Sequence, residues 1–175
     1  MGLREDVTIV PVGGLSNVAT FVALLGANGL KIAIVHDYNG SPEQRITDLV
    51  RQKLLADRSV LNVSQFRDLE KLGQNTLPTD IEDLFTPSMY LDYFHKAYDQ
   101  QLNGELLKEA DLPKGDRIVD RIERALSKKT INVRPSGGFN HYTVAAMFGS
   151  TPPSKLDEET VTRFSSLFDA VNRLF

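Results

Sequence analysis

The sequence contains no cysteine, which excludes disulfides, zinc–thiolate sites, iron–sulfur clusters and cysteine nucleophiles. It has no apolar run that approaches the roughly 20 residues needed to cross a bilayer. Its first residues lack the charged-then-apolar pattern of a secretory signal. We therefore expect a cytoplasmic protein with no membrane partner.

An excess of positive charge is also missing, because 20 Lys and Arg face 23 Asp and Glu, which gives a net charge of −3. Proteins that hold nucleic acid through their overall charge are usually basic. Any nucleic-acid role must therefore rest on a local patch, a metal site or a missing partner domain. The 175 residues, 41% of them hydrophobic, predict a soluble globular protein of one domain, with or without a small appendage.

The first part of the chain alternates predicted strands and helices. Short β-branched or apolar runs predict strands at Val7–Val12, Lys31–Val35 and Val60–Val63. Because Lys31–Val35 is almost unbroken in apolar character, we expect it to be buried on both faces of a sheet. Helices are predicted after the possible caps Ser16 or Asn17, and after Ser41. This order predicts an α/β fold with right-handed crossovers and a parallel sheet.

The remainder of the chain is predicted to be mainly helical. Thr79 and Glu82 could cap a short helix, and helical spacing of apolar residues marks four further segments: 89–101, 118–126, 140–148 and 157–175. We therefore divide the chain into an α/β domain, residues 1–85, and a helical extension, residues 86–175, that packs on it.

The segment most informative about chemistry is the end of the second predicted strand, where Asp37 is followed two residues later by Asn39. Residues two apart on an extended chain share a face, and the carboxyl end of a parallel strand is where such sheets place ligands. Their hard oxygen donors suit Mg²⁺ or Mn²⁺. An ordinary strand-to-helix turn uses the same residue types, and both interpretations stay open.

Three other features have a plain structural explanation beside a functional one. Gly13 and Gly14 could let the backbone approach a phosphate, or could simply form a tight turn. Glu82 and Asp83 could place carboxylates at the edge of a core, or could favour the first turn of a helix. A stretch of basic residues could contact phosphates, or could stabilise a helix C-terminus; it comprises Arg124, Lys128, Lys129 and Arg134. His141 is expected to pack or cap rather than to catalyse.

Taken in order, several short motifs resemble successive parts of a TOPRIM domain: Pro11–Gly14 with Asn17-Val18, then Val35–Asn39, then Ile81–Phe85. More narrowly, they resemble the C-terminal nuclease region of OLD-family (overcoming lysogenization defect) proteins, which join an ABC-type ATPase to a TOPRIM nuclease. Three later segments are similar to the helical part that follows TOPRIM in that family: 128–132, 140–145 and 167–172.

This resemblance implies metal-dependent cleavage of a DNA phosphodiester with Mg²⁺ or Mn²⁺ as cofactor. It makes Asp37 the principal metal ligand, with Asn39 at the second position of the pair. Glu82 and Asp83 occupy the acidic position after the sheet, and Glu82 joins Asp37 in the catalytic set. Lys129, or Lys128 beside it, is the cation expected near the scissile phosphate, and the turn at Gly13 and Gly14 lies near the site.

The chain departs from the family pattern in three ways. The first TOPRIM strand, which ends in a glutamate, and its helix are not found before Val7; Asn39 is neutral where an aspartate is typical; and the ATPase is absent. We therefore expect a fragment that is weakly active or inactive alone and that meets DNA only together with the missing part.

Two alternatives remain. The chain could be a catalytically silent TOPRIM-like module for interaction or homodimerisation, an idea motivated by aromatic residues expected to be exposed in Met89–Tyr98. It could also be a receiver-like or phosphatase-like α/β domain in which Asp37 is the phosphoacceptor.

Overall fold

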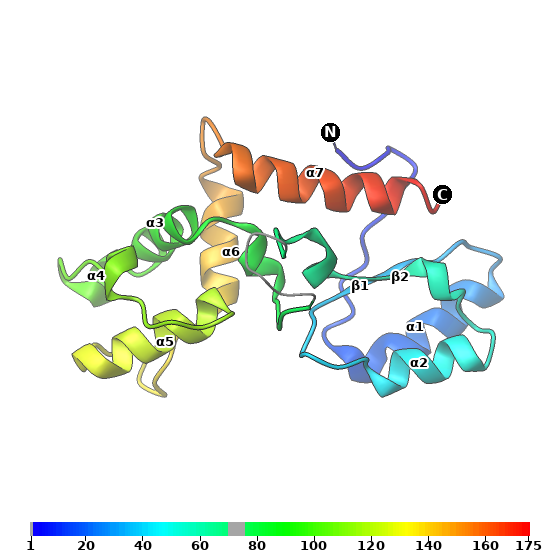
Figure 1. The fold of residues 1–175 in the computed structure, drawn as a ribbon, viewed down its shortest axis with the longest axis horizontal. Coiled ribbons are helices and arrows are strands. Elements are labelled where there is room, and N and C mark those ends of the chain that lie inside the picture. Colours follow the sequence, from blue (N-terminus) through cyan, green and yellow to red (C-terminus); the bar gives the residue numbers. More distant parts are fainter. Residues whose placement is uncertain (1, 70–75) are drawn as a thin grey trace. The chain divides into compact units, whose positions relative to one another are not determined.

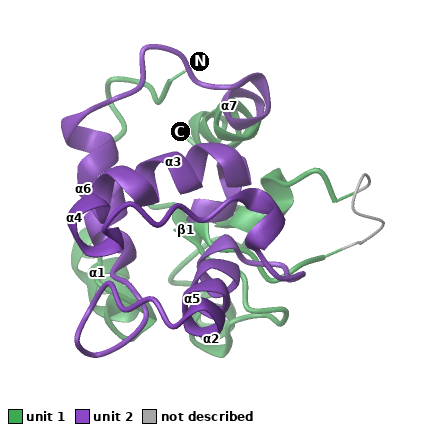
Figure 2. Ribbon diagram, turned by 90° about the vertical axis from the view of Figure 1, so that its left-hand side faces the viewer, with its two compact units in different colours: residues 1–81, 163–175 green, residues 82–162 purple. Residues whose placement is uncertain are grey.

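The computed structural model describes residues 2–69 and 76–175. The chain forms two compact units, the first made of residues 1–81 with 163–175 and the second of residues 82–162, coloured separately in Figure 2. These compact units are not the two domains, 1–85 and 86–175, that the sequence predicts. That division into domains stays a prediction.

The first unit contains a small parallel sheet. Strand β1, Ile34–His36, pairs with strand β2, Val60–Asn62, so that Ile34 lies opposite Val60 and His36 opposite Asn62. Within the described residues the sheet has no third strand. The parallel pairing and the alternation of strands with helices confirm the α/β class in its general form.

Two predictions about strands are wrong in detail. Val7–Val12 runs without a turn or bend but joins no ladder within the described part of the chain. Only the end of the predicted strand Lys31–Val35 belongs to β1, and Val35 is 42% exposed, so this strand is not buried on both faces. Regular pairing needs a neighbouring strand, and Val7–Val12 has none within the described residues. Burial on both faces needs packing on both faces; the first two helices pack on the side of Ile34, whereas Val35 points to the other side.

Helices α1, Leu15–Ala27, and α2, Gln44–Arg51, lie side by side against the sheet (Figure 1). Their apolar faces build the core of the first unit, which contains Val18, Val22, Leu49 and Leu55 and packs against Ile32, Ile34 and Val60. Two short 3₁₀-helices flank β2: η1, Asp57–Ser59, and η2, Val63–Phe66.

The predicted caps of these two helices are wrong. Helix α1 begins after Gly14, whose φ of 123° is accessible to glycine and strained for other residues, so the chain enters the helix before Ser16 or Asn17 can cap it. Helix α2 begins after Glu43 rather than after Ser41, and no side chain caps it.

The second unit is helical, as the periodicity predicts. Its helices are α3, Pro87–Ala97, α4, Asp99–Leu102, α5, Ile118–Lys129, and α6, His141–Ser150, with the 3₁₀-helix η4, Glu109–Asp111. The 3₁₀-helix η3, Ile81–Leu84, starts at the last residue of the first unit's N-terminal segment and continues into the second unit. Helix α7, Glu158–Asn172, begins in this unit and continues into the first. Among residues 2–69 and 76–175, no helix has both the length and the apolar character needed to span a bilayer.

The aromatic residues of α3 form the centre of this unit's core. Phe94 is fully buried, and its ring contacts those of Tyr98 and Phe139 at centroid distances of 5.3 and 5.0 Å. Tyr90 and Tyr93 are also buried, because residues three and four apart share the helix face that packs on α6. The expectation of exposed aromatic residues in Met89–Tyr98 is therefore wrong. The hypothesis of a module for interaction or homodimerisation was based on that exposure and is no longer supported by it.

Candidate functional site

Asp37 follows β1 directly, at the carboxyl end of the parallel pair, and it is exposed to solvent. Its Oδ1 accepts a hydrogen bond from the backbone N–H of Ile81 at 3.0 Å. Backbone hydrogen bonds in both directions between Tyr38 and Thr79, each 2.8 Å long, hold these two segments together. The carboxylate is therefore oriented by backbone groups at the position where parallel sheets place ligands.

Asn39 lies in the loop between β1 and α2, and its Nδ2 donates a hydrogen bond to Oε1 of Glu43 at 3.0 Å. This contact fixes the plane of the Asn39 amide. Sequence analysis missed Glu43 as a partner of the predicted pair, because a glutamate just before a helix is explained by the helix dipole alone. The only available signal was its position in the same short loop.

The predicted turn at Gly13 and Gly14 is present, with φ values of 68° and 123°. The side chain of Asn17 stabilises this turn, because its Nδ2 donates to the carbonyl oxygen of Val12 at 2.9 Å. The two glycines are thus explained by local geometry, and a role near a phosphate stays a prediction.

Glu82 belongs to the second unit, where its Oε1 lies 2.7 Å from Nδ1 of His141, the first residue of α6. The Glu82 side chain is 17% exposed and that of His141 is 57% exposed. Asn140, and not His141, caps α6 by accepting from the N–H of Tyr142, so the capping role expected of His141 is wrong. No sequence signal links Glu82 with His141, because they are far apart in the chain.

Asp83, next to Glu82, is 5% exposed, and its Oδ1 accepts the backbone N–H of Ile118 at 2.6 Å. Ile118 is the first residue of α5, whose own N-cap residue, Arg117, makes no side-chain cap. Asp83 therefore accepts one of the backbone N–H groups that have no partner within the first turn of α5, although Asp83 lies outside that helix. Its carboxylate also places a negative charge at the positive end of the helix dipole.

Lys129, in the last turn of α5, forms an ion pair with Asp111, with 3.2 Å between Nζ and Oδ2. The backbone N–H of Lys108 and, after it, the Lys129 ammonium lower the pKa of Asp111 below its usual value. Lys129 thus has a carboxylate partner in its own unit.

The predicted site residues fall into two groups, and each group is defined within its own unit. Asp37 and Asn39, with the turn at Gly13 and Gly14, belong to the first unit, whereas Glu82, Asp83 and Lys129 belong to the second. Across the described residues, no cluster of three or more His, Cys, Asp or Glu side chains is arranged to hold a metal ion.

Comparisons with protein-family models, with curated proteins and with solved structures give no match for this chain.

Proposed function

We propose that Asp37, together with Asn39, binds a divalent cation, and that the chain is a TOPRIM-like nuclease region of an OLD-family protein acting on DNA phosphodiesters. The observation that supports this proposal is the position of Asp37. Its exposed carboxylate directly follows a parallel strand and is oriented by the Ile81 N–H, in the region where open α/β sheets bind ligands.

The donor atoms of Asp37 and Asn39 are hard oxygens, which suit Mg²⁺ or Mn²⁺. Mg²⁺ is commonly held by one or two carboxylates, with waters and phosphate oxygens completing its coordination. When bound, such an ion supplies activation of water and stabilisation of negative charge on a phosphate. The side chains of Asp37 and Asn39 would hold and orient it, with Glu43 restraining the Asn39 amide.

This site has low negative charge, because Asn39 is neutral. Affinity for a hard cation rises with the number of charged ligands, so weak binding and weak or absent activity of the isolated chain are expected. The roles predicted for Glu82, Asp83 and Lys129 remain part of the proposal. For Asp83 there is a competing demand, since its carboxylate already binds the N–H of Ile118.

The test is a calorimetric titration of the protein with MnCl₂, comparing the unaltered chain with Asp37→Ala and with Asp57→Ala. Asp57 is an exposed acid in the same unit, at the start of η1, and so it controls for loss of surface charge. We expect Mn²⁺ binding to be lost in Asp37→Ala and retained in Asp57→Ala. Equal titrations for the two variants would refute the assignment of Asp37.

A second experiment addresses the DNA substrate through nicking of supercoiled plasmid in the presence of Mn²⁺. Any nicking by the protein should disappear in Asp37→Ala and persist in Asp57→Ala. Nicking that survives the change at Asp37 would come from another site or from a contaminant, and would contradict the proposed reaction.

A further inference from the structure

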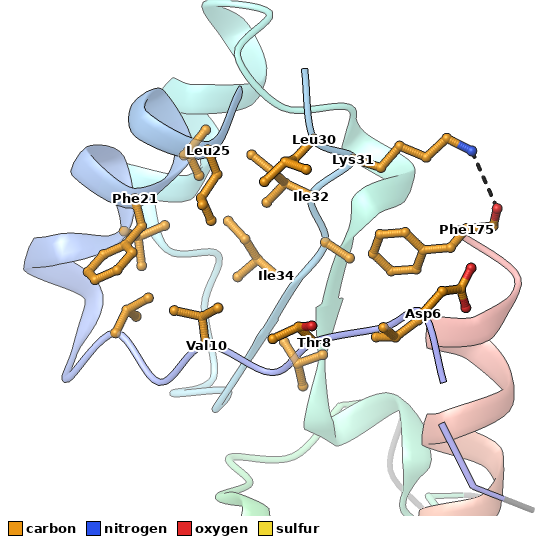
Figure 3. A pocket seen from close by; sticks show the side chains of 16 residues that line it. Asp6, Thr8, Val10, Phe21, Leu25, Leu30, Lys31, Ile32, Ile34 and Phe175 are labelled. Atoms are coloured by element: carbon orange, nitrogen blue, oxygen red, sulfur yellow. Dashed lines mark hydrogen bonds between the residues drawn. The ribbon is translucent and has the colours of Figure 1, made fainter. Parts of the chain in front are cut away.

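The first unit contains an apolar groove of about 560 Å³ that the proposed metal site does not use. Figure 3 shows the side chains of Thr8 and Val10 on one wall, Ile32 and Ile34 on another, and Phe21 of α1 on a third, directed toward a common hollow.

The wall around β1 is the edge of a strand rather than one of its faces. Ile34 and Val35 of β1 both line the groove, as do the four residues before the strand, Leu30–Ala33. Successive side chains of a strand point to opposite faces, so an unbroken run of lining residues means that the groove follows the backbone. Strand β1 pairs with β2 on one side, and within the described residues its other side has no partner strand.

The opposite wall also presents unpaired backbone. Val7–Val12 runs without a turn or bend. Within the described part of the chain, the backbone N–H and C=O groups of residues 8–10 make no hydrogen bond to other backbone groups. Asp6 and Val7 both line the groove, and from Thr8 on the lining alternates, because Thr8, Val10 and Val12 line it whereas Ile9 does not and is 71% exposed. This alternation is that of an extended chain with one side facing the groove.

Open strand edges are templates for pairing with another extended chain. We propose that this groove accepts a β-strand from a partner polypeptide, with β-branched or other apolar side chains at alternate positions. The added strand pairs with the open edge of β1 through its backbone, and its apolar side chains cover Phe21 and Val10. This inference does not depend on the proposed function.

The probe is a dye-labelled, end-blocked peptide of about eight residues, a common strand length, that alternates Val and Thr between terminal lysines. Its control is the same peptide with alternate backbone nitrogens methylated, which removes N–H donors and keeps the side chains. We expect saturable binding in fluorescence anisotropy, with affinity for the methylated peptide reduced about tenfold or more, since several backbone hydrogen bonds are lost.

Two matched pairs of protein variants test the position of the strand. Val10→Lys and Leu25→Lys place a charge in the groove, whereas Ile9→Lys and Leu24→Lys place it on neighbouring residues that do not line it. We expect about tenfold weaker binding for the first two variants and little change for the other two. Amide exchange at Ile32–Val35 should slow when the peptide is bound.

Three results would overturn the proposal. The first is equal binding of the methylated peptide, which would indicate a site for apolar side chains or small apolar ligands. The second is no binding at about 1 mM peptide, the limit of useful affinity. The third is self-association of the protein alone that Val10→Lys abolishes and Ile9→Lys preserves, which would identify a second copy as the occupant.

Discussion

Replacement of Asp83 by alanine should destabilise the second unit by about 2–3 kcal/mol. The carboxylate is 5% exposed and accepts the N–H of Ile118 at 2.6 Å, and a hydrogen bond to a charged group contributes about 1.5–3 kcal/mol. Its charge also lies at the N-terminus of α5, where a partly buried anion contributes up to about 2 kcal/mol. These two contributions overlap, so the expected loss lies below their sum.

Urea unfolding followed by circular dichroism measures this loss, with two further variants for comparison. Asp83→Asn keeps an acceptor and removes the charge, so we expect about half of the effect. Asp120→Ala removes an exposed acid from the first turn of the same helix and should cost less than about 1 kcal/mol. If Asp83→Ala were no more destabilising than Asp120→Ala, the capping role of Asp83 would be refuted.

Three further predictions concern single sites. Asp157→Ala should cost about 1–2 kcal/mol, because Asp157 caps the start of α7 by accepting the N–H of Thr160 at 2.8 Å. Burial acts to raise the pKa of Asp157, but the hydrogen bonds from Thr160 and Thr86 together lower it below the usual value of an aspartate. The stability that ionised Asp157 contributes is therefore complete above the usual pKa of an aspartate and is lost as the pH falls through the lower folded-state pKa. In urea unfolding, the difference in stability between wild type and Asp157→Asn should therefore shrink below about pH 4. Lys129→Ala should raise the pKa of Asp111 only partly toward its usual value, because the hydrogen bond from the backbone N–H of residue 108 is the larger cause of its lowering. NMR titration measures this pKa, and a full return to the usual value would show that Lys129 is the larger cause. Gly14→Ala should cost about 1–3 kcal/mol in thermal unfolding, because φ is 123° there; an unchanged melting temperature would show that the turn tolerates a side chain.

Sequence reasoning located the helices well because their information is local. Apolar spacing predicted a helix over 118–126, and α5 spans Ile118–Lys129. Asn140 lies at the predicted start of α6 and caps it. Periodicity and capping residues act within a few positions of one another, so a single sequence contains them.

Pairing across long distances in the chain was not accessible in the same way. The sequence predicted a strand at Val7–Val12 from its β-branched residues, but a strand needs a neighbour, and the structure gives this segment none within its described residues. The contact of Asp83 with Ile118 joins two elements that no local pattern connects. The same holds for Glu82 and His141.

Part of the candidate site could be predicted and part could not. Asp37 was found because a polar residue at the end of an apolar strand has a general meaning in parallel sheets. The orientation of its carboxylate by the Ile81 N–H depends on the bridge between Tyr38 and Thr79. That bridge joins residues far apart in the sequence, and no local pattern predicts it. Whether the second group of acids takes part in metal binding stays a prediction, because it belongs to a separate unit.

The most direct test of the proposed cation site is paramagnetic broadening by Mn²⁺ in the NMR spectrum of the ¹⁵N-labelled protein. The proposal predicts that the amide signals of Asp37 and Asn39 broaden first, at the lowest Mn²⁺ concentrations, and that Asp37→Asn removes this effect. Broadening that begins elsewhere, or that is unchanged in Asp37→Asn, would contradict it.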